Sequence, residues 1–267
     1  MSWGVAGLRV SFGPTEALDG INLEVPPGRV TAVVGGDGAG KTTLLRVMAG
    51  LVAPRAGTVR RPRQEQIGYL PTRSGGFRDL TVAENLEFVA AAARLPGTGR
   101  RADDLLERTG LAPFRKRLAR DLSGGMRQKL GVVMAMLPSP AMLVLDEPTT
   151  GVDPVSRADL WRLIALAAAQ GAAVLVSSAY LDEAERAAWV MVLREGRSLV
   201  AGTPAEVTAS LPGAVVDVDA PTDPARAWRR GPRWREWRPN GDPTAIAPTL
   251  EDVVIVASLA AETGRAR

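Results

Sequence analysis

A glycine-rich segment near the N-terminus has the residue types and spacing of a phosphate-binding loop. Its glycines at 35, 36, 38 and 40 come before Lys41 and Thr42 and follow the apolar run 30–34. Glycine adopts backbone conformations that a Cβ would forbid, so successive N–H groups can converge on one anion. Lys41 is expected to reach the β- and γ-phosphates of a nucleotide, and the Thr42 hydroxyl to ligate Mg²⁺. The residues expected to bind ATP here are Gly35, Gly36, Asp37, Gly38, Ala39, Gly40, Lys41, Thr42 and Thr43.

The alternative for this segment is a glycine-rich hairpin with a chance lysine. The chain has only three lysines, at 41, 116 and 129. A lysine at this position between a strand and a helix therefore favours the nucleotide site.

A second apolar run, expected to be a buried strand, is followed by two carboxylate residues. Asp146 and Glu147 follow the apolar residues 141–145, and ligands bind at the carboxyl ends of parallel strands. Asp146 is expected to hold Mg²⁺ through water, and Glu147 to polarise the attacking water as the catalytic residue. The alternative is a polar strand end without function.

A third segment, Ser123-Gly124-Gly125-Met126, begins a helix whose apolar positions recur with helical spacing to 137. Taken alone, Ser123 is best interpreted as an ordinary helix N-cap beside two loop glycines.

Composition excludes several kinds of site. The 267 residues include no cysteine and no histidine, which rules out disulfides, Cys/His zinc sites and His-based triads. The net charge of +4 is mild and does not by itself require nucleic acid. No apolar run reaches the length of about 18 residues that a membrane span needs, and the N-terminus does not resemble a signal peptide. We expect a cytoplasmic chain that needs partners for any role at a membrane.

Hydrophobic periodicity predicts an α/β fold with a parallel sheet and an antiparallel β edge at the N-terminus. Strands are expected at 5–12, 21–25, 30–34, 66–70, 141–145, 172–177 and on both sides of 195–196, with a short strand or turn at 58–63. Helices are expected at 42–51, after a Thr81/Glu84 capping box, at 103–111, after Ser123, and at 155–169, 181–187 and 248–259.

The tail contains a Trp/Arg cluster. Its members are Trp228, Arg229, Arg230, Arg233, Trp234, Arg235, Trp237 and Arg238. One interpretation is stacking on nucleic acid. The favoured one is a small hairpin with its turn at 239–241 and its aromatic side chains packed against the main unit.

The order of the motifs resembles the ATP-binding-cassette (ABC) family over about residues 5–205. The matching segments are GKTT at 40–43, LSGG at 122–125, LDEP at 145–148 and GVDP at 151–154. The finer resemblance is to exporter ATPases that pair with ABC-2 permeases, in particular the first cassette of tandem multidrug-export ATPases, and to the ribosome-associated ATPase.

The resemblance implies a P-loop NTPase fold of ABC type. Residues 1–205 would form the ATP-binding domain, with a RecA-like core, an N-terminal antiparallel β subdomain and a helical subdomain at about 73–140. Residues 206–267 would form a C-terminal appendage with a β hairpin and a terminal helix.

The resemblance also implies that two such domains enclose two ATP molecules head to tail. Phe12 would stack on adenine, and Asp153 would lie at the dimer seam. The signature residues Ser123, Gly124, Gly125 and Met126 would contact the ATP of the partner.

Two family positions depart from the pattern. Thr72 stands where the family usually has the glutamine of the Q-loop, and Ala179 stands where it has the switch histidine. Our hypothesis is that the chain's own site is degenerate beside an intact signature. It would then pair with a complete cassette as a heterodimer, although a homodimer remains open.

These features predict an ATPase subunit of an ABC exporter, with ATP and Mg²⁺ as cofactors and a separate ABC-2-type permease as partner. The chain would be peripheral at the cytoplasmic face of the membrane, and the permease would contact the surface between Thr72 and Leu86. The alternatives are a non-transport ABC ATPase that acts on ribosomes or nucleic acid, which is not favoured, and a nucleotide-binding regulatory module without turnover.

Overall fold

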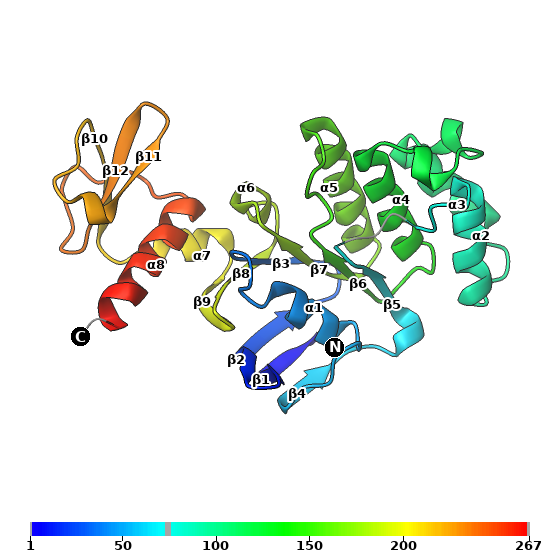
Figure 1. The fold of residues 1–267 in the computed structure, drawn as a ribbon, viewed down its shortest axis with the longest axis horizontal. Coiled ribbons are helices and arrows are strands. Elements are labelled where there is room, and N and C mark those ends of the chain that lie inside the picture. The colour runs from blue at the N-terminus through cyan, green and yellow to red at the C-terminus, as the bar shows by residue number, and fades with distance from the viewer. Residues whose placement is uncertain (1, 73–75, 266–267) are drawn as a thin grey trace.

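A central six-stranded sheet organises the protein (Figure 1). Its strands in spatial order are β5 (Ile67–Leu70), β6 (Met142–Asp146), β7 (Ala173–Ser178), β3 (Val30–Val34), β8 (Trp189–Arg194) and β9 (Arg197–Gly202). All neighbours pair in parallel except β8 and β9. Every residue of β3, β6 and β7 is buried, as their largely apolar sequences predict for strands covered on both faces. The computed structural model describes residues 2–72 and 76–265.

An antiparallel sheet covers one side of the helix that follows the glycine-rich loop. It consists of β2 (Thr15–Val25), β1 (Trp3–Phe12) and β4 (Ala56–Arg60) in that order. Helix α1 (Lys41–Met48) lies between this sheet and the central sheet, because Leu44 and Met48 share one buried cluster with Leu8 and Leu175. The N-terminal antiparallel sheet predicted from the sequence is confirmed.

Helices pack on the other face of the central sheet and extend beyond β5 (Figure 1). They are α2 (Val82–Ala92), α3 (Gly99–Thr109), α4 (Gly124–Met136) and α5 (Pro154–Ala169), with the shorter α6 (Leu181–Ala184) and α7 (Pro204–Ala209) nearer β8 and β9. Short 3-10 turns occupy Gln64–Gln66, Ala112–Phe114, Ala119–Asp121 and Pro224–Arg226. The predicted capping box is present, since Thr81 N donates to Glu84 Oε2 at 2.7 Å. Residues 73–75, at the start of the predicted helical subdomain, lie outside the described residues.

The C-terminal appendage is a three-stranded antiparallel sheet and a long helix. Its strands in spatial order are β10 (Ala214–Val218), β12 (Arg233–Arg238) and β11 (Ala227–Arg230), and its helix is α8 (Leu250–Arg265). The prediction of a hairpin turn at 239–241 is wrong. The turn is Gly231-Pro232, because Arg230 pairs with Arg233 and Gly231 takes a φ of 60°, a conformation that favours glycine.

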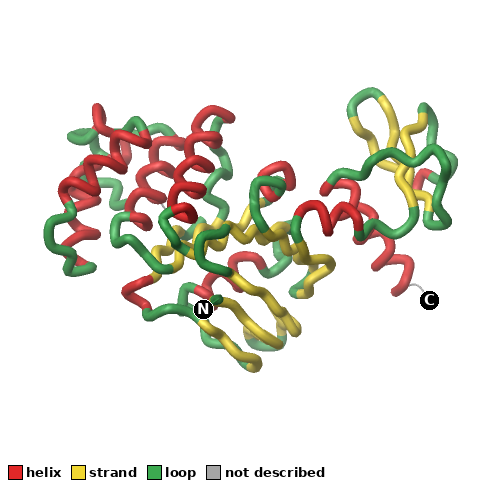
Figure 2. Tube along the Cα trace, turned by 180° about the vertical axis from the view of Figure 1, so that it is seen from behind, coloured by secondary structure: helices red, strands yellow, loops and turns green. Residues whose placement is uncertain are grey.

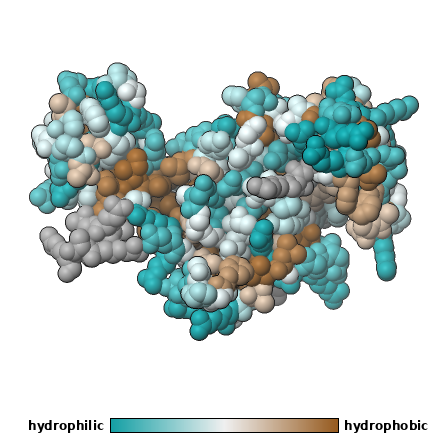
Figure 3. All heavy atoms as spheres, in the orientation of Figure 1, coloured by the Kyte–Doolittle hydropathy of each residue, from teal (hydrophilic) through white to brown (hydrophobic). Residues whose placement is uncertain are grey.

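The aromatic side chains of the appendage do not pack against the main unit as predicted. Trp237 is 7% exposed and shares a cluster with Val215 and with Val256 of α8. The main core instead receives Leu250 and Val253 from the first turns of α8. Helix α8 therefore joins the appendage to the rest of the fold, from which the small sheet projects (Figure 2). In Figure 3 apolar residues gather where α7 and α8 meet.

Candidate nucleotide-binding site

The glycines of the loop after β3 have two different roles. A Cβ on Gly35 would lie 2.2 Å from the carbonyl oxygen of Leu193, and one on Gly40 would lie 2.7 Å from Leu18 Cδ2. These two positions also have φ values of 153° and 105°, so packing and conformation both require glycine. A Cβ on Gly36 or Gly38 would meet nothing within 4 Å. The open side of the loop is therefore free to receive a phosphate group close to the backbone.

The loop lines a cavity of about 360 Å³. Its lining runs from Asp37 to Thr43 and includes Thr15–Ala17, Glu147, Glu195 and Gly196. The N–H groups of the first turn of α1 have no partner within the helix, so an anion at this point is stabilised. Phe12 is 53% exposed at the end of β1, three residues before Thr15. The residues that line this cavity thus include most of the predicted ATP contacts.

Lys41 connects the loop to the carboxylates after β6. Its side chain is 5% exposed, and Nζ donates to the carbonyl oxygens of Gly35 at 2.8 Å and Gly36 at 3.2 Å. The same nitrogen lies 3.3 Å from Glu147 Oε1. The predicted phosphate ligand and the predicted catalytic carboxylate are therefore direct neighbours.

The side chain of Asp146 accepts hydrogen bonds from two hydroxyl groups, one at each carboxylate oxygen. It is 1% exposed, Ser177 Oγ donates to its Oδ1 at 2.6 Å, and Thr72 Oγ1 donates to its Oδ2 at 2.8 Å. Each carboxylate oxygen can accept more than one hydrogen bond, so Asp146 retains the capacity to accept from a further donor. Thr72, at the glutamine position of the family, is thus hydrogen-bonded to the predicted metal residue.

Glu147 has an uncommon backbone conformation with φ 49°. Non-glycine residues with positive φ cost free energy and cluster at functional sites. Its N–H donates to Ser177 Oγ at 2.9 Å, and its Oε2 accepts from Thr150 Oγ1 at 3.2 Å. These contacts orient the carboxylate of Glu147 toward Lys41.

Sequence reasoning missed a buried acid behind the switch position. Ala179 is exposed, and next to it Ser178 Oγ donates to Glu183 Oε2 at 2.7 Å. Thr149 Oγ1 donates to the same oxygen at 2.7 Å, and Arg157 Nε lies 3.5 Å from Glu183 Oε1. Glu183 is 1% exposed. The sequence signal for this network was the polar pair Ser177-Ser178 at the end of an apolar strand.

The signature residues and Asp153 lie together. Ser123 Oγ accepts from the N–H of Met126 at 3.2 Å, which confirms the predicted helix cap. Asp153 Oδ1 accepts from the N–H groups of Val155 and Ser156, and the backbone hydrogen bond from Ser156 is the main cause of the lowered pKa of Asp153.

A Cβ on Gly125 would lie 2.9 Å from Ser156 Oγ and 3.4 Å from Asp153 Oδ2. The start of α4 is therefore packed tightly on the start of α5. None of residues 123–126, all of them described, lines the cavity at the phosphate loop.

No helix in the described ranges is long and apolar enough to cross a membrane.

Known proteins share both the sequence and the fold. The ABC transporter family model matches residues 18–150. The chain is 41% identical over 209 residues to the probable multidrug ABC transporter ATP-binding protein YbhF of Escherichia coli. The matched region covers 74% of this chain but only 36% of that protein. It is 37% identical over 228 residues to the daunorubicin resistance ATP-binding protein DrrA3 of Streptomyces coeruleorubidus. This match covers 80% of this chain and 72% of that protein.

A solved ATP-binding subunit of an ABC transporter matches with a TM-score of 0.72 and 28% identity, covering 78% of this chain and 92% of the other. The α/β fold class of ABC type predicted from the sequence is confirmed. The chain belongs to the family of ABC transporter ATP-binding proteins.

Proposed function

We propose that this chain is the ATP-binding subunit of an ABC exporter, which binds and hydrolyses MgATP to drive transport through a separate membrane permease. The observation that carries this proposal is the contact between Lys41 Nζ and Glu147 Oε1 at 3.3 Å. This contact supports the proposal because the residue proposed to bind phosphate and the residue proposed to activate water line one cavity. The names of the relatives, which refer to multidrug and daunorubicin resistance, support export as the process.

The residues at the cavity fit MgATP. The loop amides and Lys41 would hold the phosphates, and Thr42 and Asp146 would hold the metal, whose charge neutralises the phosphate oxygens during cleavage. Ser177 and Thr72 fix the orientation of Asp146 through both of its oxygens. Glu147 would accept a proton from, or orient, the attacking water.

We infer that the chain works in a head-to-tail pair of cassettes. Ser123, Gly124 and Gly125 begin α4 away from the chain's own phosphate loop, so they are available to a partner's nucleotide. Val155, two residues after Asp153, is 75% exposed, so the start of α5 presents an apolar side chain at the proposed seam. Because Thr72 and Ala179 replace two polar groups of the family, a complete cassette is the proposed partner.

The surface for an ABC-2-type permease would lie on α2 and the loop before it. Phe77 and Phe88 are 50% and 49% exposed and touch edge to face, with ring centroids 4.5 Å apart. Buried Asn85 shapes this loop, since its Nδ2 donates to the carbonyl oxygens of Phe77, Leu80 and Thr81. An aromatic pair formed by a residue of this fixed loop and a residue of α2 suits a partner helix. The chain would thus be peripheral at the cytoplasmic face of the membrane.

The Trp/Arg cluster does not support the alternative of ribosome or nucleic-acid binding. Arg233 lies 3.4 Å from Asp219, and Arg235 lies 3.4 Å from Asp217 and also pairs with buried Asp252. Arg238 pairs with Asp242. Arginines that carboxylates already neutralise contribute little to phosphate binding.

The test is ATP hydrolysis by the purified chain, with Glu147→Gln as the inactive control and Ala179→His beside it. We expect slow turnover that Ala179→His raises by about 10²-fold, the typical effect of one aligned polar group on a transition state. ATP binding should change little in that variant. Fast turnover by the unmodified chain would refute the degenerate site, and failure to bind MgATP would refute the whole proposal.

A further inference from the structure

The exposed apolar side chains of the protein are not all accounted for by the proposed function. Among the described residues the large ones are Phe12, Leu51, Phe77, Phe88, Val155 and Trp189. Four of them belong to the adenine position, the permease surface or the dimer seam. Of the remaining two, Trp189 lines a cavity. Exposed tryptophan in a hollow is typical of ligand sites, because its large flat ring binds planar groups.

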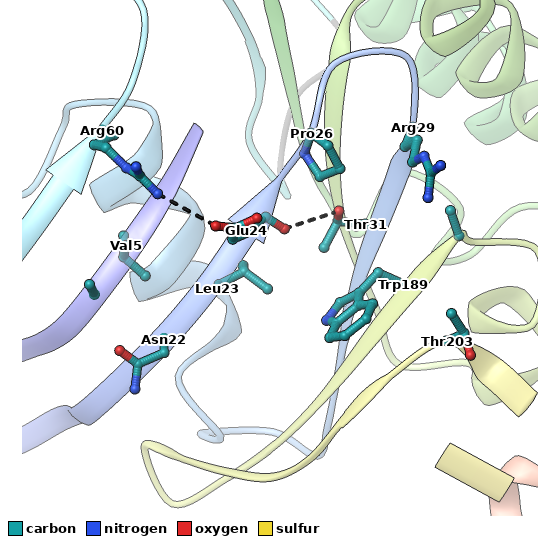
Figure 4. A pocket seen from close by; sticks show the side chains of 12 residues that line it. Val5, Asn22, Leu23, Glu24, Pro26, Arg29, Thr31, Arg60, Trp189 and Thr203 are labelled. Atoms are coloured by element: carbon teal, nitrogen blue, oxygen red, sulfur yellow. Dashed lines mark hydrogen bonds and ion pairs between the residues drawn. The ribbon is translucent and has the colours of Figure 1, made fainter. Parts of the chain in front are cut away.

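The cavity measures about 540 Å³ and lies between the antiparallel sheet and the first residues of β3 and β8 (Figure 4). Val5 and Leu23 contribute apolar side chains to it, and the ring of Trp189 projects into it from the start of β8. Trp189 pairs with Thr31 in the parallel ladder. The phosphate loop follows the opposite end of β3, so this hollow is separate from the nucleotide cavity.

The charges at the cavity favour an anion. Arg29 lines it, and although its backbone carbonyl accepts from the N–H of Val174, its guanidinium has no hydrogen-bond or ion-pair partner among the residues that the structure describes. The carboxylate of Glu24, the acid in the lining, lies 3.6 Å from Arg60. The lining thus contains one carboxylate and two guanidinium groups, and its net charge is positive beside the apolar side chains.

The other polar side chains of the lining already have partners. Asn22 Oδ1 accepts from the N–H of Gly7 at 2.9 Å, and its Nδ2 donates to the carbonyl oxygen of Gly20 at 3.2 Å. Thr203 Oγ1 accepts from the N–H of Glu206 at 3.2 Å. Recognition of a ligand therefore depends on the ring of Trp189 and the guanidinium of Arg29.

We propose that this cavity binds a small planar aromatic carboxylate. The ring system would lie against Trp189 and the apolar side chains of Val5 and Leu23, and the carboxylate would pair with Arg29. The volume suits a ligand of one or two fused rings with a short acidic arm. A charged hydrogen bond to a planar guanidinium provides the selectivity for the acid. This site does not depend on the proposed function, because nothing in it uses the nucleotide cavity.

The test is calorimetric titration of the whole chain with 2-naphthoate and with 2-naphthalenemethanol, a neutral probe of similar shape. We expect naphthoate to bind at least about tenfold more tightly, since hydrogen bonds to charged groups are among the strong ones. Arg29→Gln should remove that preference and leave the alcohol unchanged. Trp189→Leu should weaken both probes, because it removes the ring but keeps an apolar side chain.

The matched control is Arg55→Gln, which removes the same charge from an exposed position outside the cavity and should preserve the preference. Equal affinities for the two probes in the unmodified chain would overturn the proposal. So would an Arg29→Gln variant that keeps the preference, or an Arg55→Gln variant that loses it. Arg29 lies in an exposed turn without side-chain partners, so its substitution should leave folding intact even if Trp189→Leu does not.

Discussion

Removal of the Glu183 side chain should destabilise the protein more than removal of any exposed side chain. The carboxylate is 1% exposed and accepts two hydrogen bonds of 2.7 Å, from Thr149 and from Ser178. Arg157, 24% exposed, lies 3.5 Å from its other oxygen. In Glu183→Ala the two hydroxyl groups lose their shared acceptor and Arg157 loses its ion-pair partner, and water has little access to replace the carboxylate.

The size of the effect follows from the number and type of these contacts. Hydrogen bonds to a charged group contribute about 1.5–3 kcal/mol each, and loss of one partner of a buried ion pair costs about 3–5 kcal/mol. The terms overlap, because they share one carboxylate. We therefore expect Glu183→Ala to lower the free energy of unfolding by about 3–5 kcal/mol. Glu183→Gln keeps one acceptor oxygen and should lose about half as much.

Urea denaturation followed by tryptophan fluorescence measures this change. Glu185→Ala is the matched control, since Glu185 is exposed two residues away and should change stability by less than about 0.5 kcal/mol. A loss below about 1 kcal/mol for Glu183→Ala would refute the reasoning, because it would mean that the three partners find equivalent bonds elsewhere.

Three further predictions concern other parts of the chain. Lys41→Met should weaken MgATP binding by at least about 10²-fold in a fluorescence titration while the fold is retained, because it removes a cation from the phosphate site. Trp237→Ala should lower the free energy of unfolding of the appendage by about 3–5 kcal/mol in urea, with Trp237→Phe losing less. The hydrogen bonds of Thr244, with Arg238 beside them, lower the pKa of Asp242 from 3.8 to about 2. Its contribution to stability is therefore complete above pH 3.8 and lost as pH falls toward about 2, and Asp242→Asn should remove that part of an acid-unfolding curve.

The elements that carry the motifs were predictable from the sequence. Strands β3 and β6 are short, almost entirely apolar runs followed by a glycine or ending in a carboxylate, and such runs are typical of buried parallel strands. The cap of α4 and the capping box of α2 depend on local residue chemistry, which tertiary packing did not override. The loop between β3 and α1 has the conformation that its glycines allow.

The arrangement of the appendage was not predictable from the sequence. The pair Ser177-Ser178 indicated a polar network, but not that Glu183 is its buried acid. Two possible turns, Gly231-Pro232 and the segment 239–241, both contain proline and glycine, and pairing with β10 decides between them. Glu183 lies in a charged segment that is typical of a solvated helix. Only the fold brings Thr149, Ser178 and Arg157 from three separate elements around it.

We infer that Thr72 separates nucleotide binding from hydrolysis at the proposed site. Its hydroxyl donates to Asp146 at 2.8 Å, on the side of the metal residue rather than at the open face of the cavity. A glutamine is longer by two bonds and could extend past Asp146 toward an attacking water. Threonine would therefore keep Asp146 oriented for Mg²⁺ but would supply no group to the reacting phosphate. Because Ala179 supplies none either, we infer that this cavity holds MgATP well and turns it over slowly.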